Sequence, residues 1–150
     1  MQRSIINYQP IVPIFLLIGL ILYESITSIY VYITPLAGYI FLYIVENIKK
    51  KEKRWIIVAL FIYLTYFELD RDFFVFSSLI LFLIYYRFIH SELKATIACK
   101  NCLKIAIIFI YYFGFYIINL LFALIFNYQL PKLDIAYIVF LISDIVVVLL

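Results

Sequence analysis

The chain has 150 residues, of which 68% are apolar and 14% are charged, and its formal net charge is +3. A soluble domain contains about 45–50% apolar residues, and a small globule cannot hide a much larger apolar share from water. The composition therefore excludes a soluble monomer and an intrinsically disordered chain, and with them a large catalytic head, a nucleic-acid-binding module and a soluble cofactor-binding fold. It leaves an integral membrane protein with almost no domain outside the bilayer.

The first apolar run extends from residue 11 to residue 48 and carries only two charges, Glu24 and Glu46. At 1.5 Å per residue, a single helix of this length would measure about 57 Å, whereas the hydrocarbon core is about 30 Å thick. The run must therefore fold back. Thr34-Pro35 marks the break, because proline disfavours helix in the residue before it. We predict a first helix at about 11–31 and a second, shorter one at about 35–48.

Four further apolar segments predict helices at about 55–69, 73–89, 105–127 and 134–150. A polar turn, Asp70-Arg71-Asp72, separates the first two, and a polar stretch from His90 to Lys104 precedes the third. Short connections favour antiparallel packing of neighbouring helices. We therefore expect an all-α membrane protein with one domain over residues 1–150, a polytopic bundle of about six transmembrane helices. Four or five spans stay open, because the second and third predicted helices are short.

Basic residues gather on one side of this six-helix arrangement. The other side has only Arg71 and Lys132, whereas the basic side has Arg3, Lys49, Lys50, Lys51, Lys53, Arg54, Arg87, Lys94, Lys100 and Lys104. The positive-inside rule then predicts that both termini are cytoplasmic. The run Lys49–Arg54 is typical of a topology anchor, and it could also attract anionic lipid head groups or an acidic partner.

Polar side chains inside predicted spans are candidates for function, because they are costly in hydrocarbon. Glu24, Asn119 and Asp144 lie within helices, and Glu68 lies near a helix end beside Asp70. One interpretation is a proton or cation relay, or a polar pocket for a substrate. The other is interhelical hydrogen bonding, worth about 1 kcal/mol per bond, or contact with a partner helix. We favour the second, because no Lys, Arg or His lies in the interior of any predicted span.

Cys99 and Cys102 have the spacing of a redox pair or of half a zinc site. A zinc site would need two further ligands, whereas the chain has no other cysteine and a single histidine, His90. The predicted cytoplasmic position also disfavours a disulfide. Two small residues on an interfacial helix are the simpler interpretation, and we predict no metal and no cofactor.

The polar and proline-marked segments follow one another in a definite order. An acid followed by serine stands past the middle of the first helix, a proline turn and a basic loop follow, and acids end the third helix. A basic stretch, a long fifth helix and a proline turn come next. The segments are Leu22-Tyr23-Glu24-Ser25, Thr34-Pro35-Leu36, Phe67-Glu68-Leu69-Asp70, Tyr86-Arg87-Phe88-Ile89-His90 and Pro131. Over about residues 11 to 150, this order resembles the MreD family of bacterial cell-shape proteins.

The resemblance implies a non-enzymatic scaffold subunit of the cell-elongation machinery in the bacterial inner membrane. Such a subunit would bind lipid and an MreC-like periplasmic scaffold protein, and through it the glycosyltransferase RodA and a penicillin-binding transpeptidase that make peptidoglycan. Glu68 and Asp70 would be the structural equivalents of the acids that the family carries at the third helix. The family is also similar in shape to the substrate-binding subunits of vitamin transporters.

Two alternatives stay open at this point. In the first, the chain is a substrate-binding or accessory subunit of a small-molecule transporter, and Glu24, Asn119 and Asp144 line a pocket between helices. The absence of alanine from the first helix argues against this alternative, because vitamin-binding subunits tend to dock their partner through alanines there. In the second, Cys99 and Cys102 serve a membrane thiol enzyme.

Overall fold

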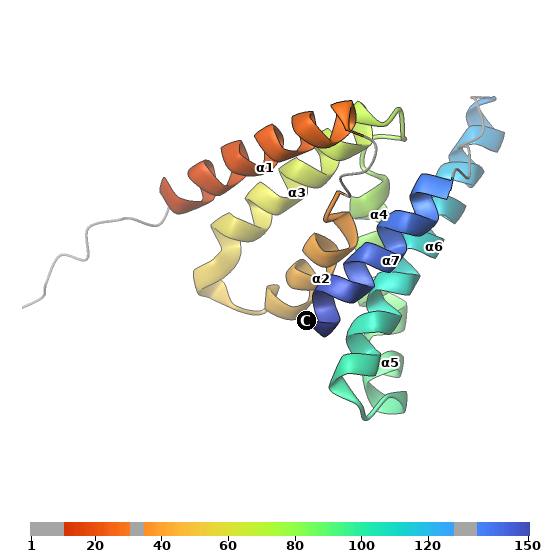
Figure 1. Cartoon of the computed structure of the whole chain (residues 1–150). Coiled ribbons are helices and arrows are strands. Elements are labelled where there is room, and N and C mark those ends of the chain that lie inside the picture. Colours follow the sequence, from red (N-terminus) through yellow and green to blue (C-terminus); the bar gives the residue numbers. More distant parts are fainter. Residues whose placement is uncertain (1–10, 31–34, 128–134) are drawn as a thin grey trace, which may run out of the picture.

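The computed structural model describes residues 11–30, 35–127 and 135–150, and every regular element in these ranges is helical. This confirms the all-α class expected from the sequence. The elements, shown in Figure 1, are α1 (Ile11–Ile29), α2 (Ala37–Asn47), the 3₁₀ turn η1 (Lys51–Lys53), α3 (Arg54–Asp70), α4 (Ser77–Ile84), the π-helical turn η2 (Tyr85–Ile89), α5 (His90–Thr96), α6 (Lys100–Phe126) and α7 (Ile135–Leu149).

Each predicted helix has a counterpart, with two differences in the boundaries. α4 begins later than predicted, at Ser77, because the backbone passes through left-handed conformations at Asp72 and Phe76, where φ is 56° and 70°. The stretch from His90 to Lys104, expected as a polar connection, is mostly helical and forms α5 and the first turn of α6. It contains neither glycine nor proline, the residues least compatible with a helix, and the helix is interrupted only at residues 97–99.

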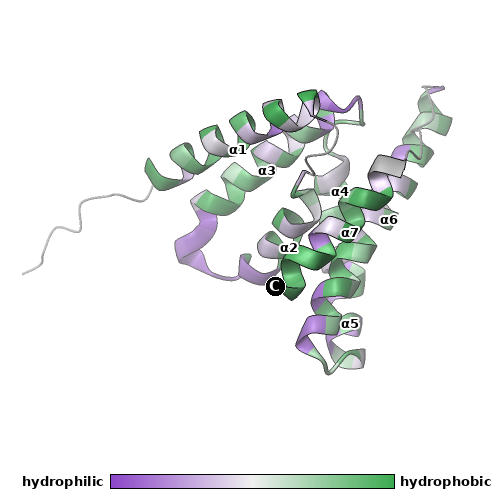
Figure 2. Ribbon diagram, viewed as in Figure 1, coloured by the Kyte–Doolittle hydropathy of each residue, from purple (hydrophilic) through white to green (hydrophobic). Residues whose placement is uncertain are grey.

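Successive helices run in alternating directions, with α1, α3 and α6 pointing one way and α2, α4 and α7 the other (Figure 1). α2 packs against α3, α6 and α7, while α1 lies along α3 and α4 lies along α6. The polar segments η1 and α5 lie at the same end of the bundle (Figure 2). This arrangement agrees with short connections between antiparallel neighbours in the chain.

Aromatic rings fill the core around α2. Phe41 on α2 is fully buried, and its ring centroid lies 4.8 Å from that of Tyr111 on α6. Edge-to-face contacts at 6.1 Å and 6.0 Å join Phe41 to Phe82 on α4 and to Tyr85 on η2. Such aromatic pairs have preferred geometries. They therefore set the position of α2 relative to α4 and α6.

Two of the described helices, α1 with 19 residues and α6 with 27, are long and apolar enough to cross a bilayer by length and composition. In the most apolar part of each, 17% of α1 and 33% of α6 is buried inside the fold. The other helices of the bundle are shorter: α2 has 11 residues, α3 has 17, α4 has 8 and α7 has 15. Most of the apolar surface of α1 and α6 thus faces outward.

Candidate functional site

The fold buries four of the five polar residues singled out in the sequence. Glu24, Glu68 and Asp144 are 0% exposed and Asn119 is 3% exposed, whereas Asp70 is exposed at the end of α3. A buried carboxylate or amide is costly unless it is hydrogen-bonded. The partners of each side chain therefore decide what it can do.

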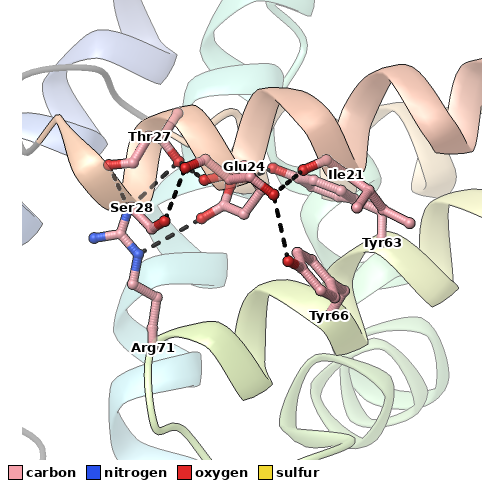
Figure 3. Close-up of polar contacts among 8 residues, drawn as sticks. Ile21, Glu24, Thr27, Ser28, Tyr63, Tyr66 and Arg71 are labelled. Carbon is pink, nitrogen blue, oxygen red and sulfur yellow. Dashed lines mark hydrogen bonds and ion pairs between the residues drawn. The ribbon is translucent and has the colours of Figure 1, made fainter.

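Glu24 joins α1 to α3 (Figure 3). The Tyr63 hydroxyl of α3 donates a hydrogen bond to Glu24 Oε2 at 2.8 Å. Glu24 Oε1 lies 3.5 Å from Nε of Arg71, which follows the last residue of α3. Ser25, the residue after Glu24 on α1, places its Oγ 3.5 Å from the hydroxyl of Tyr66, which lies three residues after Tyr63 on α3. Polar groups therefore connect the two helices along one line of contact.

Arg71 is the functional side chain that sequence reasoning missed. Its position lies in the polar turn, but its side chain reaches back among the helices and is only 21% exposed. Besides Glu24, it contacts the backbone oxygen of Thr27 at 3.4 Å and Thr27 Oγ1 at 3.5 Å, and it lies over the Phe140 ring of α7 at 5.5 Å. Long basic side chains can reach well beyond their own backbone position. The signal in the sequence that could have pointed to this contact was an arginine in a turn, together with an acid, Glu24, that had no basic partner within its own predicted helix.

Glu68 caps the N-terminus of α4. Its Oε2 accepts a hydrogen bond from the Phe76 backbone N–H at 2.6 Å, and its Oε1 accepts one from the Ser78 N–H at 2.5 Å. Phe76, the residue before α4, has no polar side chain that could cap the helix. The first N–H groups of a helix have no partner within it, and a negative charge there also interacts favourably with the helix dipole. From α3, Glu68 supplies both the hydrogen-bond acceptors and the negative charge at the start of α4.

Asn119 holds the same turn from α6. Its Oδ1 accepts hydrogen bonds from the Phe74 N–H at 2.9 Å and from Ser77 Oγ at 3.3 Å. Its Nδ2 donates to the Phe115 backbone oxygen one turn earlier, at 2.8 Å. Both ends of the Asn119 amide are thus engaged. Together with Glu68, it fixes the connection between α3 and α4.

Asp144 of α7 caps the N-terminus of α2 in the same way. Its Oδ2 accepts hydrogen bonds from the backbone N–H groups of Gly38 at 2.8 Å and Tyr39 at 3.3 Å, and from the Tyr112 hydroxyl at 2.7 Å. A Cβ atom on residue 38 would lie 2.6 Å from Asp144 Oδ2 and 2.8 Å from a Tyr112 ring carbon. Glycine is therefore what allows α7 to approach α2 this closely.

These contacts assign a structural task to each buried polar group. Among the hydrogen bonds described above, Glu24, Glu68 and Asp144 share no partner, and each binds a different pair of helices. Asp144 Oδ1 is buried without a hydrogen-bond partner in the described part of the chain. The arrangement can hold short helices in place. It brings Glu24 together with Arg71, but it does not bring the three acids onto a common ligand.

The two cysteines lie on the surface as free thiols. Cys99 is the N-cap residue of α6, and its Sγ accepts a hydrogen bond from the Cys102 N–H at 3.4 Å. Hydrogen bonds from Cys102, first from its side chain and then from its backbone, lower the pKa of the Cys99 thiol. Within the described ranges, no group of three or more His, Cys, Asp or Glu side chains is placed to hold a metal ion.

The chain matches no protein-family model, and comparisons with curated proteins and with solved structures also find no match. The resemblance to the MreD family therefore rests on the order of the sequence features. Of the residues that carry it, Glu24 and Glu68 are buried in helix contacts, whereas Asp70 is exposed.

Proposed function

We propose that this chain is a multi-pass protein of the bacterial inner membrane, with about six spans and both termini in the cytoplasm. Large apolar side chains on the outer faces support this proposal. Phe15 on α1 is 72% exposed, Phe88 on η2 is 69% exposed and Ile125 on α6 is 71% exposed. On α1, exposed large apolar side chains continue from Ile11 to Ile29, and soluble monomers rarely expose a continuous apolar patch of this kind. A lipid environment removes the free-energy cost of exposing these apolar side chains to water.

The short helices can lie in a bilayer where their ends find partners inside the fold. At 1.5 Å per residue, the 11 residues of α2 span about 17 Å and the 17 residues of α3 about 26 Å, less than a hydrocarbon core of about 30 Å. A short helix in a bilayer leaves its end at a depth where water cannot satisfy the backbone. Asp144 and Glu68 accept hydrogen bonds from the N-terminal N–H groups of α2 and α4. In a bilayer, these buried acids would therefore stabilise the fold by capping its short helices.

Within the membrane, the chain acts as a non-enzymatic scaffold subunit of the cell-elongation complex, as its resemblance to the MreD family implies. Its partners are an MreC-like periplasmic scaffold protein and, through it, RodA and the transpeptidase. The observation that carries this proposal is the use of the buried polar groups: Glu24, Glu68, Asn119 and Asp144 hold helices together. What the fold offers outward is mainly apolar helix surface, which lipid or a closely packed partner helix would cover.

Separate experiments test the membrane placement and the scaffold role. Alkaline carbonate extraction should leave the chain in the membrane fraction, and release into the soluble fraction would contradict the membrane placement. Conditional depletion in a rod-shaped host should round the cells, and the tagged chain should co-purify with the periplasmic scaffold protein. Normal cell shape after complete loss would refute the scaffold role. A vitamin bound to the purified chain would instead favour the transporter alternative.

A further inference from the structure

A cavity of about 400 Å³ opens at the end of the bundle where α2, α5 and α6 meet. This is the polar end that carries η1 and α5 (Figure 2). The charged and polar side chains in its lining come from three separate segments of the chain. They are Glu46, Asn47, Lys50, His90, Lys94, Lys100 and Lys104.

The charges in this cavity are out of balance. Four lysines line it, against a single carboxylate, Glu46. Among the described residues, the Glu24–Arg71 contact is an ion pair, but no carboxylate lies within ion-pair distance of these lysines. Like charges brought together repel one another, and a cleft lined by one sign of charge attracts the opposite ion. The charge of the cavity lining therefore favours an anion.

His90 adds a polar group that the fold leaves unpaired. Its ring lies 5.7 Å from Tyr85 and 5.3 Å from Tyr86, and its Nδ1 is buried without a hydrogen-bond partner in the described part of the chain. Burial lowers the pKa of the imidazole, and the charges of Lys94 and Lys49 lower it further. His90 follows directly on the π-helical turn η2, a rare type of turn that is frequent at functional sites.

We propose that this cavity binds the phosphate group of an anionic ligand, carried either by a lipid head group or by a small soluble phosphate ester. A phosphate offers several oxygen acceptors to ammonium groups that approach from different sides, which matches lysines on three segments. Basic pockets between helices at the cytoplasmic membrane surface are suited to such head groups. The proposal goes beyond the scaffold role and does not depend on it. Only its lipid form depends on the membrane placement.

A pair of charge-matched variants tests the site in the full-length chain. Lys94→Gln with Lys104→Gln removes two charges from the cavity. Lys51→Gln with Arg54→Gln removes two exposed charges at the same end of the bundle but outside the lining. A third variant, Lys94→Arg with Lys104→Arg, keeps the charge in the cavity. Circular dichroism must show equal helix content in all of them.

Binding is measured in two arms. In the first, the proteins are placed in nanodiscs of mixed phosphatidylglycerol and phosphatidylcholine, and the lipid retained after detergent extraction is counted by native mass spectrometry. In the second, glycerol phosphate is titrated onto lipid-free protein in detergent and followed by ³¹P NMR. Retained phosphatidylglycerol with no glycerol phosphate binding identifies a lipid ligand, and the reverse identifies a soluble ester.

We expect the cavity variant to bind its ligand roughly 10- to 30-fold more weakly than the wild type, because it loses two direct charged contacts to the phosphate that the control variant keeps. The control and the arginine variant should stay within about threefold of wild type. Equal weakening by the cavity and control variants would mean that general surface charge attracts the anion. That result, or no binding in either arm, would overturn the proposal, whereas the depletion and extraction experiments would be unaffected.

Discussion

The contact between Glu24 and Arg71 can be tested by exchanging Arg71 for methionine, which keeps much of the side-chain length but removes the charge. Glu24 is fully buried, and its Oε1 has Arg71 at 3.5 Å and no hydrogen bond in the described structure. Removing one partner of a buried pair costs about 3–5 kcal/mol, because the other charge is left uncompensated. Arg71 is 21% exposed, so we expect the lower end of that range, about 3 kcal/mol.

The reverse exchange should cost less. Glu24→Gln leaves an oxygen that can still accept from Tyr63, and the partly exposed Arg71 can turn toward water. We expect a loss of about 1 kcal/mol, the net value of a typical hydrogen bond. The double variant, Glu24→Gln with Arg71→Met, should be more stable than Arg71→Met alone, because no buried charge remains.

The free energy of unfolding is measured by titrating SDS into mixed micelles and following the fluorescence of Trp55, the single tryptophan. Arg54→Met, which removes an exposed arginine from the other end of α3, is the control and should stay within about 0.5 kcal/mol of wild type. A loss below about 1 kcal/mol for Arg71→Met would place the pair among ordinary surface ion pairs and refute this reasoning.

Four further predictions address the caps, the thiols and the orientation of the chain. Gly38→Ala should lower the free energy of unfolding by about 1–3 kcal/mol, because its Cβ would lie 2.6 Å from Asp144 Oδ2; Gly19→Ala, with nothing within 4 Å of its Cβ, should be neutral or slightly stabilising, and equal effects would contradict the close approach. Glu68→Gln should cost about 1–3 kcal/mol, because its amide nitrogen cannot accept from a helix N–H; the exposed Asp70→Asn is the control, and a loss as small as its own would refute the cap. Because hydrogen bonds from Cys102 lower the pKa of Cys99, iodoacetamide should modify Cys99 at a lower pH than an ordinary thiol. Mass spectrometry should find this advantage reduced in Cys102→Ala, and an unchanged pH profile would contradict it. An impermeant maleimide should label both cysteines in inverted vesicles but not in intact spheroplasts, and labelling of spheroplasts would reverse the proposed orientation.

The helices were predictable because apolar segments and their interruptions are local properties of the sequence. Thr34-Pro35 and the acids of the turn after α3 marked breaks that need no knowledge of the fold. The start of α4 was misplaced, because left-handed backbone at Phe76 depends on the cap that Glu68 provides. The helical character of residues 90–96 was missed, because the polar composition was interpreted as a connection.

The partners of the buried acids could not be predicted in the same way. Asp144 binds the N–H of Gly38, which lies 106 residues away in the sequence, and no local pattern links an acid to a distant helix start. Arg71 was assigned to the turn, although its side chain pairs with Glu24 inside the bundle. In both cases the missing information was the direction of a side chain.

The distribution of polar contacts decides how a partner could bind this chain. Glu68, Asn119 and Asp144 are buried inside the fold. The outward faces of α1 and α6, by contrast, carry apolar side chains such as Phe15 and Ile125. Inside a bilayer such faces gain no hydrophobic energy from contact with another helix, so association must rest on close packing. Single apolar exchanges on these faces should therefore have small effects, and a partner is better mapped by cysteine cross-linking along α1, which packs mainly against α3 and leaves its other faces open.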